Sequence, residues 1–311
     1  MTPRPGADRL LGLFTNPYLL MSLGILCWSG NFIVGRWASL DTPPIALSFW
    51  RHLFAVLIVL PFFAQQLKGD WPTVRSRIGI VLVMGMLTAA GNTLVYYAIL
   101  YTTVVNAALI NAGVPVAVFA FSWFLLRVGV SRAQVVGILL AFTGIAIVVT
   151  RARLDVLLNL ELGLGDLFML LAILCWALYF VLLKRASLAI KPGTLLLIVT
   201  AASTGWLVPA FGIELSLGIT MDWTGRTVAC LAYVVLFSTI LAWICINYGT
   251  LKLGPNQSSA FMCLHPVYGA FLGAIFFSEE LESYHWTGTF LVLAGVILVS
   301  RILAERYPER F

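Results

Sequence analysis

The chain has 311 residues, of which 61% are hydrophobic and only 10% charged, and its formal net charge is +6. With a mean hydropathy of +0.98, it has too little polar surface to cover a water-soluble globule of this size. The composition therefore excludes a soluble globular protein and predicts one that lives in a lipid bilayer.

Ten apolar runs follow one another along the chain, each close to the roughly 20 residues that a helix needs to cross about 30 Å of hydrocarbon. They lack the alternation that a lipid-facing β-strand requires, so we expect an all-α integral membrane protein with ten transmembrane helices. No separate cleavable apolar stretch precedes the first run, so we expect no removable signal peptide. The expected spans are residues 17–37, 44–66, 78–101, 104–126, 132–150, 163–184, 193–214, 226–250, 256–278 and 286–303.

Two blocks of the sequence recur. Leu26-Cys27-Trp28 returns 148 positions later as Leu174-Cys175-Trp176, and a second block recurs at an offset of 151. We interpret the chain as a duplication, with domains at 17–150 and 163–303 that contain five spans each. Because five is odd, the two repeats would enter the bilayer with opposite orientations, which is the architecture of a carrier.

The basic residues predict the orientation. If the amino terminus is cytoplasmic, 14 of the 19 lysines and arginines lie on the cytoplasmic side, so we expect both termini there. This asymmetry and the attraction of basic residues to anionic lipid headgroups account for the net charge, which gives no reason to expect nucleic-acid binding. The five cysteines all fall inside expected spans without metal-ligand spacing, so we predict no metal site and no cofactor.

Several short motifs resemble a known family. They are Cys27-Trp28-Ser29-Gly30-Asn31-Phe32, Phe49-Trp50-Arg51, His265-Pro266-Val267 and Phe276-Phe277-Ser278-Glu279-Glu280. In this order and spacing they resemble the EamA-type branch of the drug/metabolite transporter superfamily, and in particular its aromatic amino acid exporters. The resemblance implies a ten-helix inverted repeat that moves small metabolites, often amino acids, outward across a bacterial inner membrane.

Polar and aromatic side chains at membrane depth mark a candidate cavity, because they are costly to place in lipid and usually face a partner or water. Each has a structural alternative: the tryptophans could equally pack helices together, and the asparagines could form interhelical hydrogen bonds. The candidate substrate-binding residues are Trp28, Asn31, Asn92, Tyr96, Asn111, Trp176, Tyr179, Tyr233, Ser258 and His265.

Four further features invite specific interpretations. His265 is a candidate proton carrier because imidazole titrates near neutral pH, but a neutral histidine bonded to a neighbouring helix is an equal alternative. Arg51 is interpreted first as a side chain that reaches lipid headgroups or a helix end, and second as a ligand for a carboxylate. Pro115 and Pro266 occupy equivalent positions in the two repeats and are candidate hinges.

No Asp or Glu lies in the middle of an expected span, so the carboxylate relay of proton pumps and an acidic trap for organic cations are both missing. The sequence therefore favours export of amino acids with aromatic or hydrophobic side chains, by alternating access through a central cavity. The alternatives are export of other small metabolites or drugs, and a membrane subunit that transports nothing.

No GxSxG, HExxH or paired aspartates appear at membrane depth, so we predict no enzymatic activity. Since one chain contains both repeats, we expect a monomer whose partners are the small-molecule substrate and the bilayer.

Overall fold

The computed structural model describes residues 16–38, 41–101, 107, 110–111, 113–127, 131–149, 163–186, 190–265, 267–269, 272 and 283–306. These residues form helices, and no strand occurs among them. Six helical segments are long and apolar enough to cross a membrane. They are α2 (Pro17–Ala38), α3 (Pro44–Ser76), α4 (Ile78–Tyr101), α9 (Leu164–Ala186), α10 (Pro192–Ser216) and the continuous run Gly225–Leu253.

The run Gly225–Leu253 consists of α11 (Gly225–Tyr233), a π-helical segment η2 (Val234–Leu241) and α12 (Ala242–Leu253). The remaining helices are α6 (Val114–Phe121), η1 (Ser122–Leu126), α7 (Arg132–Val149), α13 (Pro255–Ala260), η3 (Phe261–Leu264) and α15 (Ser283–Arg306). The prediction of an all-α membrane protein is thus confirmed for the described part of the chain. The predicted number of ten spans stays a prediction, because the fourth and ninth fall partly on residues outside that part.

The second span ends later than predicted. We expected it to stop at residue 66, but α3 continues to Ser76 and contains both Pro61 and Pro72. Hydropathy predicts only the apolar stretch of a helix. A helix can continue through polar residues beyond that stretch, so hydropathy does not predict where it ends.

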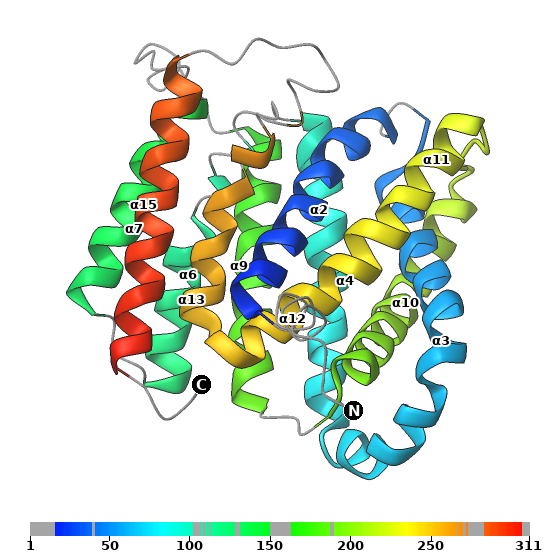
Figure 1. Ribbon diagram of the computed structural model, residues 1–311. Coiled ribbons are helices and arrows are strands. Elements are labelled where there is room, and N and C mark those ends of the chain that lie inside the picture. The colour runs from blue at the N-terminus through cyan, green and yellow to red at the C-terminus, as the bar shows by residue number, and fades with distance from the viewer. Residues whose placement is uncertain are drawn as a thin grey trace, which may run out of the picture.

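α7 and α15 lie side by side at one edge of the bundle (Figure 1). A Cβ atom on Gly144 would lie 2.6 Å from the carbonyl oxygen of Gly288, and one on Gly295 would collide with the carbonyl oxygen of Gly137. Gly137 is equivalent to Gly288, and Gly144 to Gly295, at the 151-residue offset. The two contacts therefore involve the same two equivalent positions, with the repeats exchanged. Each contact joins a glycine near the beginning of one helix to a glycine farther along the other, so α7 and α15 run antiparallel.

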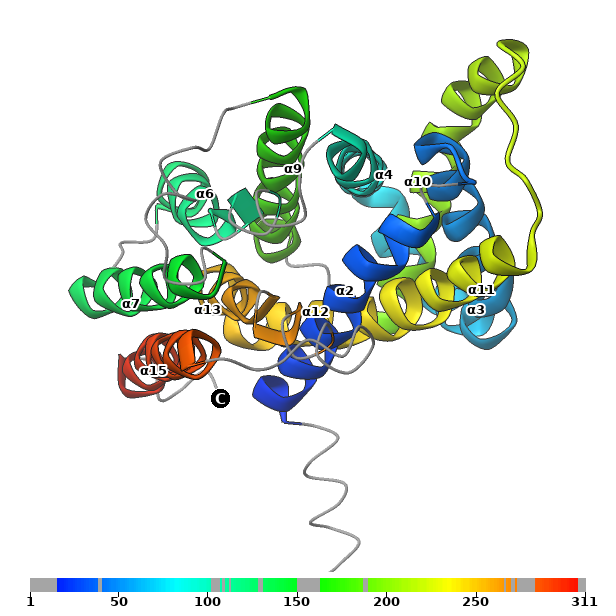
Figure 2. The same cartoon turned by 90° about the horizontal axis from the view of Figure 1, so that it is seen from above.

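α3 and α10 pack together at the opposite edge, as the view from above shows (Figure 2). The backbone N–H of Lys191, at the start of α10, donates to the Asp70 carboxylate near the end of α3 at 3.3 Å. The Glu214 carboxylate near the end of α10 accepts from the backbone N–H groups of Ile45 and Ala46 at the start of α3. Each helix therefore begins beside the end of the other, with a carboxylate at its electropositive amino terminus. These two equivalent helices also run antiparallel.

The central helices lie between these two edges (Figure 2), where α2 packs against α12 and α4 packs against α9. Glycines allow both close approaches. A Cβ atom on Gly24 of α2 would lie 2.7 Å from Ile246 of α12, and one on Gly91 of α4 would lie 3.0 Å from the ring of Trp176 on α9. The two repeats therefore meet along an interface in the middle of the bundle.

Candidate functional site

A narrow cavity lies between the central helices. Its volume is about 30 Å³, far below the roughly 300–1,000 Å³ of ordinary small-molecule sites. A solute of amino-acid size can therefore enter only if the walls move. The cavity is lined by Trp28, Asn31, Phe32, Asn92, Val95, Asn111, Val114, Trp176, Ser238, Met262 and His265.

Six of the ten predicted binding residues meet in this cavity. The equivalent tryptophans of the two repeats, Trp28 and Trp176, lie with their ring centroids 5.2 Å apart. Both repeats thus contribute to a single wall. The six residues are Trp28, Asn31, Asn92, Asn111, Trp176 and His265.

Trp28 is fixed in orientation by its surroundings. Its indole Nε1–H donates to the backbone carbonyl of Ser238 at 2.9 Å. Its ring stacks on His265 with centroids 6.2 Å apart, and Trp243 completes the cluster with edge and tilted contacts to Trp28 and Trp176. The cavity wall is therefore aromatic and held in place by packing.

The structure does not place Tyr96, Tyr179, Tyr233 and Ser258 among the cavity-lining residues. The hydroxyl of Tyr233 donates to the carbonyl oxygen of Cys27 on α2 at 3.0 Å, which ties α11 to α2. Ser258 is fully buried in α13. A buried phenol usually finds a hydrogen-bond partner on a neighbouring helix, and sequence periodicity alone could not distinguish this role from cavity lining.

Tyr96 and Tyr179 form equivalent ties in the two repeats. Tyr96 on α4 donates to Asn31 on α2 at 3.0 Å, and Tyr179 on α9 donates to Asn247 on α12 at 2.8 Å. Asn31 corresponds to Tyr179 at the 148-residue offset, and Tyr96 corresponds to Asn247 at 151. In each repeat the hydrogen bond joins the two equivalent helices, but the tyrosine and the asparagine have exchanged places between them.

Arg51 is fully buried, so the interpretation that it reaches lipid headgroups is wrong. Its Nε donates to Thr239 at 2.9 Å, its Nη1 to Tyr96 at 2.7 Å and its Nη2 to Ser238 at 3.3 Å. Two of these partners lie on the π-helical segment η2, whose Thr239 hydroxyl also donates to the carbonyl oxygen of Val234 five residues earlier at 2.7 Å. Sequence reasoning directed Arg51 outward to the headgroups, whereas its side chain is buried against η2 and α4.

His265 contacts the first repeat. Its Nδ1 lies 2.9 Å from the hydroxyl oxygen of Ser29 on α2. This is the contact that the interpretation of a neutral histidine bonded to a neighbouring helix predicts, and the proton-carrier role stays a prediction.

The structure describes one of the two predicted hinges, Pro115. Pro115 is the second residue of α6 and follows a turn at Gly113, so its missing N–H interrupts no helical hydrogen bond. Pro266 lies outside the described residues. The hinge role of both stays a prediction.

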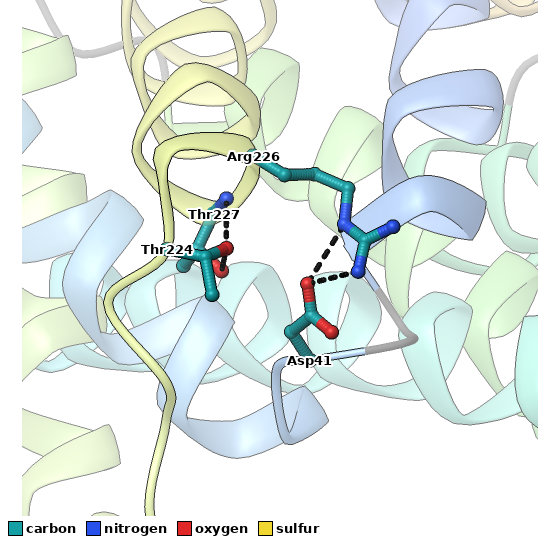
Figure 3. A network of polar contacts seen from close by, with 4 residues as sticks. All are labelled: Asp41, Thr224, Arg226 and Thr227. Carbon is teal, nitrogen blue, oxygen red and sulfur yellow. Dashed lines mark hydrogen bonds and ion pairs between the residues drawn. The ribbon is translucent and has the colours of Figure 1, made fainter.

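An ion pair joins the two repeats at the predicted outer end of the central helices (Figure 3). The Asp41 carboxylate, after α2, accepts from Nε of Arg226 on α11 at 2.7 Å and from its Nη2 at 2.5 Å. Thr224 caps α11 by accepting from the backbone N–H of Thr227 at 3.1 Å, which fixes the start of the helix that carries Arg226. About half of the Arg226 side chain is exposed, and an exposed pair stabilises by only about 0.2–1 kcal/mol. This contact can therefore break at little cost.

A family model described as EamA-like transporter family matches the chain twice, over residues 15–150 and 163–301. The chain belongs to the EamA-like transporter family. It is therefore a multi-pass membrane transporter whose sequence contains two copies of the family unit.

Two relatives of this EamA-like protein are 25% identical to it over nearly their whole length. One is an "Uncharacterized transporter" of Archaeoglobus fulgidus, with 91% of this chain and 96% of the relative aligned. The other is the "Uncharacterized transporter YyaM" of Bacillus subtilis, with 93% and 95% aligned. Neither name states a substrate.

The fold of this EamA-like chain also occurs in a solved structure named "Crystal structure of protein". The two agree with a TM-score of 0.71 over 93% of this chain and 98% of that chain, at 16% sequence identity. This likeness concerns the fold alone.

Proposed function

We propose that the protein exports amino acids with aromatic or hydrophobic side chains across a bacterial inner membrane by alternating access. The observation that carries this proposal is the shared cavity, in which Trp28 and Trp176 lie at equivalent positions of the two repeats. A cavity at the interface of two repeats is where secondary transporters bind their substrates. The protein acts as a monomer, since one chain supplies both repeats.

An inverted arrangement of the repeats is part of this proposal. It is supported by the antiparallel packing of two sets of equivalent helices, α3 with α10 and α7 with α15. In addition, α2 begins and α15 ends toward the lower side of Figure 1, in accord with two cytoplasmic termini. In this mechanism Pro115 and Pro266 absorb the bend as the halves exchange conformations.

The small size of the cavity supports an exchange between conformations rather than an open pore. A cavity of about 30 Å³ does not admit an amino acid, so the helices must separate on one side of the membrane at a time. The ion pair between Asp41 and Arg226 is weak enough to open and close during such a cycle.

The chemistry of the wall supports the substrate class. Its aromatic rings suit an apolar or aromatic side chain, and its amide, hydroxyl and imidazole groups suit a small polar head. No carboxylate lines this cavity in the part of the chain that the structure describes, which disfavours organic cations.

Counterflow in proteoliposomes tests the proposal. Vesicles loaded with one unlabelled solute should accumulate the same radiolabelled solute, and we expect phenylalanine, tyrosine or tryptophan to give rates at least about tenfold above protein-free liposomes. Exchange of amines or sugars but not of these amino acids would support export of other metabolites instead. If no solute in the panel exchanges, a subunit that transports nothing becomes the better interpretation.

A further inference from the structure

Arg51 is a fully buried cation. Its guanidinium has five N–H groups, three of which donate to Thr239, Tyr96 and Ser238. No carboxylate among the described residues pairs with it. Removing a charge from water costs several kcal/mol unless an opposite charge or several hydrogen bonds compensate it. The three hydroxyl groups supply part of this compensation, and the other two N–H groups have no acceptor among the residues that the structure describes.

Arg51 also fixes the direction of the hydrogen bonds around it, because arginine only donates. The hydroxyl of Tyr96 accepts from Arg51, so its single proton goes to Oδ1 of Asn31. Asn31 lines the cavity, and its Nδ2 group is then left as a donor. The hydroxyl of Ser238, a residue that also lines the cavity, likewise accepts from Arg51, so its own proton remains available to a different acceptor. Two cavity-lining groups therefore present donors under the control of one buried cation.

The other polar groups of the cavity present acceptors. Asn92 donates its Nδ2 to the carbonyl oxygen of Thr88 at 2.9 Å, and its Oδ1 accepts from no donor in the described part of the chain. The Ser29 hydroxyl lies 2.9 Å from the carbonyl oxygen of Ile25 and 2.9 Å from Nδ1 of His265, so when it donates to the carbonyl it accepts from Nδ1–H of His265. The Nε2 atom of the neutral ring is then an acceptor.

We propose that Arg51 makes the Asn31 and Ser238 wall a binding site for a carboxylate, so that the transported solute must carry one. Arg51 is a positioning residue: it orients the two donors and supplies the positive charge behind them. Asn92 and His265 supply acceptors for the ammonium group of the same solute. This inference rests on the proposed function and deepens it, since it names the chemical group that the site selects and the residue that sets the selection.

The test compares three solutes that share a benzyl side chain. Phenylalanine carries both charges, phenylalanine amide lacks the carboxylate, and 3-phenylpropionate lacks the ammonium group. Competition in counterflow reports on transport, and quenching of tryptophan fluorescence in detergent reports on binding without transport. We expect the wild type to prefer phenylalanine over its amide at least about tenfold, because a site built to pair with a group discriminates against solutes that lack it.

Four variants are compared with the wild type. Arg51→Gln should reduce the preference to within about twofold, and Arg51→Lys should retain part of it because the charge remains. Asn31→Asp places a negative charge in the carboxylate site and should reverse the preference toward the amide. Arg75→Gln, at the exposed end of the same helix, is the matched control and should leave the preference unchanged.

The outcomes separate this inference from the proposed function. Transport of phenylalanine by a folded Arg51→Gln protein with its preference intact would overturn the inference and leave the function standing. If Arg51→Gln does not fold, an Asn31→Asp protein that still prefers phenylalanine overturns it equally. If no solute is transported, the proposed function is wrong, and tryptophan fluorescence tests the inference separately. Quenching by 3-phenylpropionate in the wild type but not in Asn31→Asp supports the carboxylate site. The absence of quenching in the wild type contradicts it.

Discussion

Replacing Trp28 or Trp176 by alanine is expected to lower the transport of aromatic amino acids at least about tenfold, because each ring removed deletes an aromatic contact worth about 0.5–1.5 kcal/mol together with its buried area. Trp28→Ala has a second effect. It removes the Nε1–H bond to Ser238 and the ring that stacks on His265, so two other cavity-lining groups lose their fixed positions. Initial rates of counterflow, normalised to the amount of protein in the vesicles, measure the change.

The matched control is Trp286→Ala on α15. This side chain is 66% exposed on the bundle surface and does not line the cavity, so its removal should change the rate less than about twofold. Unchanged transport in both Trp28→Ala and Trp176→Ala would remove these residues from the substrate pathway.

Replacing Gly295 by leucine is expected to prevent stable packing of α15 against α7. A Cβ atom at this position would collide with the carbonyl oxygen of Gly137 and approach the backbone nitrogen of Ala141 to 2.8 Å. Backbone atoms cannot rotate away, so the helices would have to separate along their contact. Overpacking a core costs about 1–3 kcal/mol even where side chains can adjust, and we expect a loss of about 3 kcal/mol or more here. The apparent Tm of the purified protein in detergent, with the monodisperse yield, measures the effect.

Gly205→Leu on α10 is the control for the loss of glycine itself. A Cβ atom at Gly205 would meet nothing within 4 Å, so the larger side chain should be accommodated with a normal yield. Equal yields and Tm values for Gly205→Leu and Gly295→Leu would contradict the close packing of the two repeats at this edge.

Hydropathy located the helices well because crossing the bilayer is decided by the length of an apolar run, which is a local property. The first span was expected at residues 17–37 and α2 covers Pro17–Ala38, and the third expected span coincides with α4. The π-helical geometry of η2 could not be predicted in this way. It depends on how Thr239 and Val234 are placed by contacts with other helices, including the bond from Arg51.

The duplication was the most informative guide to the cavity. It brought Trp28 and Trp176 together as equivalent residues before any contact was known, and their rings lie 5.2 Å apart. Residue type alone could not separate Asn31, which lines the cavity, from Tyr96, which lies behind it and bonds to it. Both are polar groups at membrane depth, and only the packing of α2 against α4 decides which of them faces inward.

The most direct test of the inverted arrangement is to find on which side of the membrane two equivalent positions lie. Lys68, near the end of α3, and Ser216, at the end of α10, are equivalent at the 148-residue offset, and both side chains are exposed. Single-cysteine variants Lys68→Cys and Ser216→Cys, in sealed membrane vesicles of known orientation, can be labelled with a maleimide that does not cross the membrane. We predict that Lys68→Cys reacts only from the cytoplasmic side and Ser216→Cys only from the opposite side. Labelling of both positions from the same side would contradict the account.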